Sequence, residues 1–190
     1  MSGRADRRGD GEVRRLARFT IDLGDNLDLV LREPWTVDPL HELIAKNLDR
    51  LRQWEPWAQG QQTREALAQF TNHELTEWVA GRSLPAAFRQ DGVLVGSIGA
   101  RIDTYAGTAD LGYWIDADAE GRGLVSRAAR GLIDHLCGDR GVRRIEIRTA
   151  VENARSRAVA ERLGFELEGI LRRAQPVGEA FHDVALYALA

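Results

Sequence analysis

A short glycine-containing loop, Gly121-Arg122-Gly123, has residue types suited to ligand binding. It follows the apolar run 111–115 and leads into apolar residues at helical spacing, so a strand–loop–helix unit is expected. Glycine lets a ligand approach the backbone closely, and the free N–H groups of a helix N-terminus favour an anion such as a pyrophosphate. An ordinary turn is the alternative, and the third glycine of a dinucleotide-binding fingerprint is absent.

A second pair of polar residues, Asn153 and Ser156, stands at the start of another expected helix, which ends before Gly164. Asn is a favoured N-cap residue, and Ser156 would then occupy the third helical position at the same helix mouth. A plain cap beside an exposed serine is one interpretation. A functional pair close to the end of the preceding strand is the other, and these residues alone leave both open.

The elements that must position these residues follow from the hydrophobic pattern. Strand-like runs cover 18–23, 27–32, 84–89, 93–103, 108–115, 143–149, 166–172 and about 181–189. Helical spacing covers 38–51, 63–79, 124–137 and 154–163. This order predicts a mixed α/β (α+β) fold with flanking helices, in which a mostly antiparallel central sheet contains one βαβ crossover.

The composition fits one globular domain. Of 190 residues, 44% are hydrophobic and 29% charged, and a net charge of −3 gives no sign of nucleic-acid binding. No apolar run approaches the roughly 20 residues of a membrane span, and no apolar stretch follows the charged start as in a secretory signal. We expect a flexible arm over 1–15 and a single domain over 16–190. One cysteine, Cys137, excludes a cysteine-based metal site, fits a reducing cytoplasm and is expected to be buried.

Six short motifs follow one another along the second half of the chain. They are Leu111-Gly-Tyr-Trp-Ile115, Gly121-Arg-Gly-Leu124, Arg143-Arg-Ile-Glu-Ile147, Asn153-x-x-Ser156, Leu163-Gly-Phe165 and Asp183-Val-Ala-Leu-Tyr187. In this order and spacing they resemble the Gcn5-related N-acetyltransferases (GNAT). More narrowly, the chain from about Leu27 onward is similar to the bacterial ribosomal-protein serine/alanine N-terminal acetyltransferases, the RimL/RimJ-like branch.

The resemblance implies an acetyl-CoA-dependent N-acetyltransferase of the GNAT fold, cytoplasmic and homodimeric, with no metal. Two adjacent parallel strands would splay apart at the centre of the sheet, and the pantetheine arm would lie in the gap beside Trp114 and Ile115. Ser156 would be the catalytic residue, as proton donor to the departing thiolate. The remaining cofactor-binding residues would be Gly121, Arg122, Gly123, Leu124, Val125, Ser126, Asn153 and Arg157.

The sequence departs from the family pattern at Glu120, Val125 and Gln175. Glu120 stands where Gln or Arg is usual and would have to point away from a pyrophosphate, whereas Val125 replaces a small residue in a backbone contact. Gln175 stands where some relatives carry a glutamate as the proposed general base, and an amide cannot take a proton from an ammonium. Water or another base must then serve, and the candidates by residue type are Glu120, Glu74, Asp110 and His182.

Trp54 and Trp57 leave the first long helix where the family's acceptor cleft forms. With Gln175 they are the candidate substrate-binding residues, and the alternative is that one or both tryptophans belong to the core. Three functions stay open: acetylation of a protein N-terminal amine, acetylation of a small amine such as an aminoacyl or nucleoside antibiotic, and a CoA-binding module without catalysis.

Overall fold

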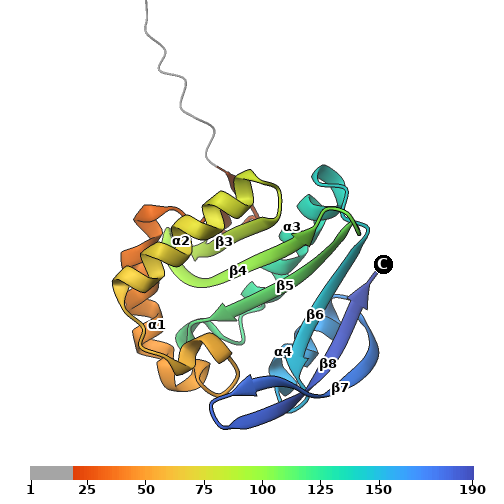
Figure 1. Cartoon of the computed structure of the whole chain (residues 1–190). Helices are drawn as coiled ribbons and strands as arrows, with labels where there is room; N and C mark the ends of the chain where they lie inside the picture. Colours follow the sequence, from red (N-terminus) through yellow and green to blue (C-terminus); the bar gives the residue numbers. More distant parts are fainter. Residues whose placement is uncertain (1–18) are drawn as a thin grey trace, which may run out of the picture.

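A computed structural model describes residues 19–190, so the expected arm over 1–15 and the domain start at residue 16 lie outside the described residues. An eight-stranded sheet is covered by helices on both faces (Figure 1). The strands are β1 (Thr20–Asp22), β2 (Leu27–Leu31), β3 (Ser83–Gln90), β4 (Val93–Asp103), β5 (Thr108–Ile115), β6 (Arg144–Ala150), β7 (Glu166–Val177) and β8 (Ala180–Leu189). The α-helices are α1 (Val37–Leu51), α2 (Arg64–Val79), α3 (Leu124–Asp139) and α4 (Ala154–Arg162), and the 3-10 turns are η1 (Pro34–Thr36), η2 (Pro56–Gln59) and η3 (Ala117–Ala119).

The strands lie in the order β1-β2-β3-β4-β5-β6-β8-β7, and every neighbouring pair except β5–β6 is antiparallel. The chain passes from β5 to β6 through α3, as a parallel pair requires. The predicted mostly antiparallel sheet with one crossover is confirmed.

The parallel strands β5 and β6 separate after a short common stretch. Their paired positions end at Asp110 and Glu146, although β5 continues to Ile115 and β6 to Ala150. In Figure 1 the two strands run apart from this point. The predicted splay of the central parallel strands is therefore confirmed.

Alternation along β5 assigns its side chains to two faces. Leu111, Tyr113 and Ile115 pack with the main core under α3 and α4, whereas Trp114 packs with Leu40 of α1 and Leu67 of α2. Figure 1 shows the same division, with α1 and α2 over one face and α3 and α4 over the other. We call these the α1–α2 face and the α3–α4 face.

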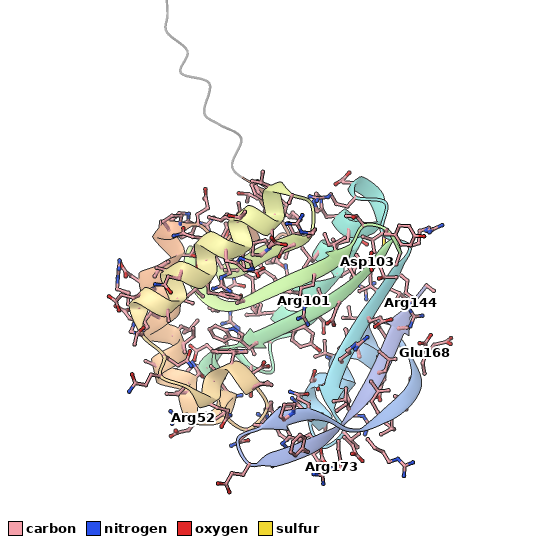
Figure 2. All side chains as sticks on the ribbon, in the orientation of Figure 1. Arg52, Arg101, Asp103, Arg144, Glu168 and Arg173 are labelled. Carbon is pink, nitrogen blue, oxygen red and sulfur yellow. The ribbon has the colours of Figure 1, made fainter. Side chains whose placement is uncertain are left out.

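In addition to the hydrogen bonds between neighbouring strands, an ion pair joins two strands of the sheet that are not neighbours. Arg144 on β6 donates to Glu168 on β7 at 2.8 and 2.5 Å, and Figure 2 shows the two side chains together at the sheet edge. This pair reaches across β8, which lies between β6 and β7. It helps to fix the β7–β8 hairpin, and β7 carries Gln175.

Three sequence expectations are corrected. Cys137 is exposed, because the buried stripe of α3 contains Leu132, Ile133 and Leu136, and the next residue turns away from it. Helix α3 continues to Asp139, beyond the expected end at residue 137, so Gly138 lies inside it. β7 extends to Val177, beyond the expected end at residue 172.

Candidate active site

A cavity of about 1710 Å³ lies where β5 and β6 separate, and residues from both faces of the sheet line it. Tyr113, Val125 and Ser156 line it from the α3–α4 face. Trp57 and Phe70 line it from the α1–α2 face. The cavity therefore passes through the sheet, and we call its two parts the α3–α4 arm and the α1–α2 arm.

The loop before α3 presents backbone amides to the α3–α4 arm. Gly121 and Gly123 have φ values of 74° and 73°, a conformation that glycine adopts without strain, and no atom lies within 4 Å of where a Cβ would stand on either. The amides of residues 121–126 find no hydrogen-bond acceptor among residues 19–190, as expected at a helix start. This row of free donors at the positive end of α3 fits a pyrophosphate such as that of CoA.

Glu120, next to this loop, is engaged by two arginines. Its carboxylate pairs with Arg50 of α1, and its Oε2 accepts from Arg155 Nη1 at 2.9 Å. Both cations offset the negative charge that Glu120 brings beside the amides.

A buried asparagine fixes the segment between β5 and the loop. Asn47, on α1 and only 3% exposed, donates from Nδ2 to Asp116 Oδ1 at 2.9 Å. Its Oδ1 accepts from the Ala117 amide at 2.9 Å, and Lys46 donates to Asp116 at 2.7 Å. Helix α1 thereby holds the chain at the point where it leaves β5 for the α3 loop.

The mouth of α4 brings Asn153, Ser156 and Tyr113 together. Asn153 Oδ1 accepts from the Ser156 amide at 3.1 Å, which confirms Asn153 as the N-cap. Tyr113 Oη lies 3.1 Å from Ser156 Oγ and 3.2 Å from the Ser156 carbonyl oxygen. Burial raises the pKa of Tyr113 to about 12, so its hydroxyl keeps its proton at neutral pH.

Two tryptophans and Gln175 line the α1–α2 arm. Trp54 is half-buried and Trp57 is 42% exposed, so neither is a core residue. Gln175 Nε2 donates to the Trp54 carbonyl oxygen at 2.5 Å, which ties β7 to the segment after α1. Trp57 Nε1 donates to Glu55 Oε2 at 2.9 Å.

Among the carboxylates that line the cavity, Glu55 differs from Glu74, Asp110 and Glu120. Glu74 accepts from Ser83 Oγ at 2.5 Å, Asp110 pairs with Arg101 at 2.8 Å, and Glu120 pairs with arginines as described. Glu55 has no cationic partner in the described part of the chain. Burial raises the pKa of Glu55, and the Trp57 hydrogen bond opposes this only in part.

His182, the remaining base candidate by residue type, does not line the cavity. Its ring lies 5.9 Å from that of Trp54, and its Nδ1 lies 3.4 Å from Glu152 Oε2.

Most of the predicted site residues are brought together around the cavity: Trp54, Trp57, Trp114, Ile115, Gly121, Gly123, Leu124, Val125, Ser126, Asn153, Ser156 and Gln175. Arg122 and Arg157 do not line it. Arg157 instead donates to Tyr187 Oη at 2.9 Å and to the Val151 carbonyl oxygen at 3.3 Å. Sequence reasoning did not single out Glu55, Tyr113 and Arg32, which do line the cavity.

Within residues 19–190, no group of three or more His, Cys, Asp and Glu side chains is arranged to hold a metal ion. None of the described helices has the length and apolar character needed to span a membrane.

Known proteins are similar to this chain in sequence and in fold. A family model described as "Acetyltransferase (GNAT) domain" matches residues 28–166. The ribosomal-protein-serine acetyltransferase of Escherichia coli K12 is 34% identical over 170 residues, which are 89% of this chain and 95% of that relative.

Two solved structures extend the comparison. The ribosomal L7/L12 α-N-protein acetyltransferase RimL in complex with coenzyme A superposes with a TM-score of 0.88 and 27% identity, over 90% of this chain and 97% of that one. The microcin C7 self-immunity acetyltransferase MccE, in complex with acetyl-CoA and AMP, gives a TM-score of 0.85 and 27% identity, over 90% and 95%. With the splayed strands, the amide-lined loop and these matches, the chain belongs to the GNAT family of N-acetyltransferases.

Proposed function

We propose that this enzyme transfers the acetyl group of acetyl-CoA to the α-amine of a protein N-terminus, of the ribosomal-protein type. The observation that carries the proposal is a cavity that passes through the sheet between β5 and β6. Such a cavity lets two substrates meet in the gap from opposite faces. The relatives that are named as ribosomal-protein acetyltransferases support this choice of acceptor.

In this proposal the α3–α4 arm holds acetyl-CoA. The free amides of residues 121–126 would bind the pyrophosphate, including that of Arg122, whose side chain is not required. Trp114 and Ile115 would lie beside the pantetheine arm, because β5 is unpaired on its β6 side beyond Asp110. Asn153 Nδ2 remains available to a ligand, because its Oδ1 serves the helix cap.

The reaction forms a bond between the acceptor nitrogen and the acetyl carbonyl carbon while the carbon–sulfur bond breaks. Ser156 Oγ would give its proton to the sulfur and recover one from water. Tyr113 would position that hydroxyl by donating its own proton to Ser156 Oγ, which leaves the serine proton free for the sulfur. Holding the amine against the carbonyl in a fixed orientation supplies much of the rate enhancement in reactions of this kind.

Glu55 is the base that the geometry favours for the amine proton. It is the carboxylate of the described cavity lining that has neither a cation nor a hydroxyl as partner, so its charge is not already neutralised. It adjoins Trp54, whose carbonyl oxygen holds Gln175. A carboxyl with a raised pKa is also a stronger base than an ordinary one.

A small amine is the second candidate acceptor. Trp57 exposes 42% of its surface beside Trp54 on the cavity wall, and two such rings could hold a planar group. The structural similarity to MccE, which was solved with acetyl-CoA and AMP, favours the same alternative. A module that binds CoA without catalysis is the third.

One assay separates the three functions. The thiol released from acetyl-CoA is measured with peptides that begin with Ser or Ala and with small amines that include an aminoacyl nucleotide analogue. Turnover on peptides alone is the expected result, and turnover on small amines alone would support the second function. Binding of CoA without turnover on any acceptor would contradict both enzymatic functions. The homodimer, the cytoplasmic location and the lack of a nucleic-acid partner remain predictions.

A further inference from the structure

Arg32 is a buried cation that has no hydrogen-bond or ion-pair partner within residues 19–190, and it lies on the wall of the α1–α2 arm. It follows β2, and its amide donates to the Pro85 carbonyl oxygen at 3.0 Å. Only 9% of the residue is exposed, and its Nε finds no hydrogen-bond partner among the described residues. The guanidinium lies over the Phe70 ring, 5.1 Å from its centre. A charge buried in this way is costly unless a partner satisfies it.

Each of the other arginines that line the cavity has at least one partner, although Arg50 Nη1 is also buried without a hydrogen bond among the described residues. Arg101 pairs with Asp110, Arg148 with Glu146, Arg162 with Ser126, and both Arg50 and Arg155 with Glu120. The negative charge of Glu74 raises the pKa of Arg32 and so opposes the effect of burial. Glu74 nevertheless accepts a hydrogen bond from Ser83 and forms no ion pair with Arg32. Burial lowers the pKa of Arg32 to about 10, so it is still charged at neutral pH.

The floor between Arg32 and the gap carries no long side chain. The sheet register places Arg32, Pro85, Gly99 and Gly112 side by side on consecutive strands, all on the α1–α2 face. A Cβ on Gly112 would meet no atom within 4 Å. With strands about 4.8 Å apart, the backbones of Arg32 and Gly112 are about 14 Å apart. An extended peptide rises about 3.3 Å per residue, so its first four residues match this span.

We propose that Arg32 is a carboxylate-binding subsite for the acceptor, an inference that rests on the proposed function. The amine lies at the gap, and a carboxylate farther along the acceptor pairs with the guanidinium over Phe70. In a protein acceptor the carboxylate belongs to an acidic side chain at the second to fourth residue. In a small acceptor it belongs to an amino acid with a long spacer.

The charge of the site favours a carboxylate over a phosphate. The positive charge of Arg32 is already partly offset by Glu74, so the site is less suited to a phosphate monoester, which carries close to two negative charges at neutral pH, than to a carboxylate, which carries one. The flat fork of an arginine also matches both oxygens of a carboxylate.

The test uses the full chain and matched acceptors. In the first series, peptides that begin with Ser and carry Asp at position two, three or four are compared with the same peptides carrying Asn. In the second series, 6-aminohexanoate is compared with its amide. The variants are Arg32→Gln, Arg32→Lys, and Arg101→Gln as the control. Arg101 points from the same face of the sheet (Figure 2) but is 82% exposed at its side chain and paired.

We expect the wild type to prefer an acidic acceptor over its amide by roughly tenfold or more in kcat/KM. Arg32→Gln abolishes the preference, Arg32→Lys keeps part of it, and Arg101→Gln keeps it. The peptide and aminohexanoate series show which source supplies the carboxylate. Equal rates with acid and amide in the wild type would overturn the inference, and so would a preference that survives in a folded Arg32→Gln variant.

A binding experiment tests the carboxylate subsite independently of turnover. If no acceptor turns over, that result counts against the proposed function and leaves the subsite to be judged by binding. The Nε–H resonance of Arg32 is followed by NMR in ¹⁵N-arginine-labelled protein and assigned by its loss in Arg32→Lys. N-acetylglycine should shift it, and N-acetylglycinamide should not. No shift with N-acetylglycine, or a shift with inorganic phosphate only, would contradict a carboxylate subsite.

Discussion

The α3–α4 arm offers free backbone amides and a helix cap, and its charged residues Arg155 and Arg162 already have partners, whereas in the described part of the α1–α2 arm Arg32 and Glu55 have no charged partner. The first arm uses the starts of α3 and α4. The second draws Arg32 from the end of β2, Glu55 from the segment after α1, and Phe70 from α2. Backbone amides are present whatever the side chains are, so they suit a substrate that is the same in every reaction. Side chains can be substituted without altering the fold, so they suit a substrate that differs between enzymes. The comparison therefore assigns the constant donor to one arm and specificity for the acceptor to the other.

The largest effect is expected in the α1–α2 arm, from Glu55→Gln. The amide cannot accept the amine proton, so kcat should fall by roughly 10²- to 10³-fold at neutral pH. Activity requires the carboxylate form, so in the wild type kcat rises as pH rises through the pKa of Glu55. Burial has raised that pKa, and this limb should therefore stand at higher pH than for an ordinary glutamate.

The check is a pH profile of both proteins with one peptide acceptor, and the matched control is Gln175→Ala, which removes an amide and no base. A profile of Glu55→Gln that keeps the limb and the wild-type rate would remove Glu55 from the mechanism.

In the α3–α4 arm, Ser156→Ala should lower kcat by roughly 10- to 100-fold and leave the KM for acetyl-CoA almost unchanged. In the proposed mechanism the serine gives a proton to the sulfur in the transition state, whereas the amides of residues 121–126 supply the binding. Steady-state kinetics with acetyl-CoA as the varied substrate separates the two constants. If Ser156→Ala weakened acetyl-CoA binding and kept kcat, the serine would be a binding group.

Gly112→Val should raise the acceptor KM by roughly tenfold and leave CoA binding unchanged. The new side chain has room, because no atom lies within 4 Å of its Cβ, but it would stand on the floor of the α1–α2 arm. Calorimetric titration with CoA and kinetics with a peptide give the two values. Weaker CoA binding with an unchanged acceptor KM would mean that the arms are assigned to the wrong substrates.

The smallest change is expected for Tyr113→Phe, which removes the hydrogen bond that positions Ser156 Oγ as well as the contact with the Ser156 carbonyl oxygen. A net hydrogen bond is worth about 1 kcal/mol, so kcat should fall by roughly fivefold while both KM values stay constant. In a Ser156→Ala background the same substitution should have almost no effect, because Tyr113 acts through Ser156. Additive effects in the double variant would contradict a positioning role.

The α3–α4 arm could be predicted from the sequence better than the α1–α2 arm. The α3–α4 arm is built by local patterns, since a glycine loop before a helix and an Asn cap are read from adjacent residues, and the splayed strands followed from the family resemblance. The α1–α2 arm depends on contacts between distant residues. Glu55 and Arg32 stand out only once the partners of the other charged residues are known, and those partners lie on separate elements.

The position of Tyr113 in the site could have been predicted from the sequence. It alternates with Gly112 and Trp114 on β5, so it had to face the opposite side of the sheet from Trp114, where α4 begins. Cys137 was misplaced for the opposite reason, because an apolar neighbourhood in the sequence was taken for burial without fixing the buried stripe of α3.

The most direct test is a crystal structure with CoA and an N-acetylated peptide product bound together. We expect the CoA sulfur to lie beside Ser156 Oγ and the pyrophosphate to lie on the amides of residues 121–126. The peptide should leave the gap across Gly112 on the α1–α2 face. A sulfur remote from α4, or a peptide that enters from the α3–α4 face, would contradict the division of the cavity between the two substrates.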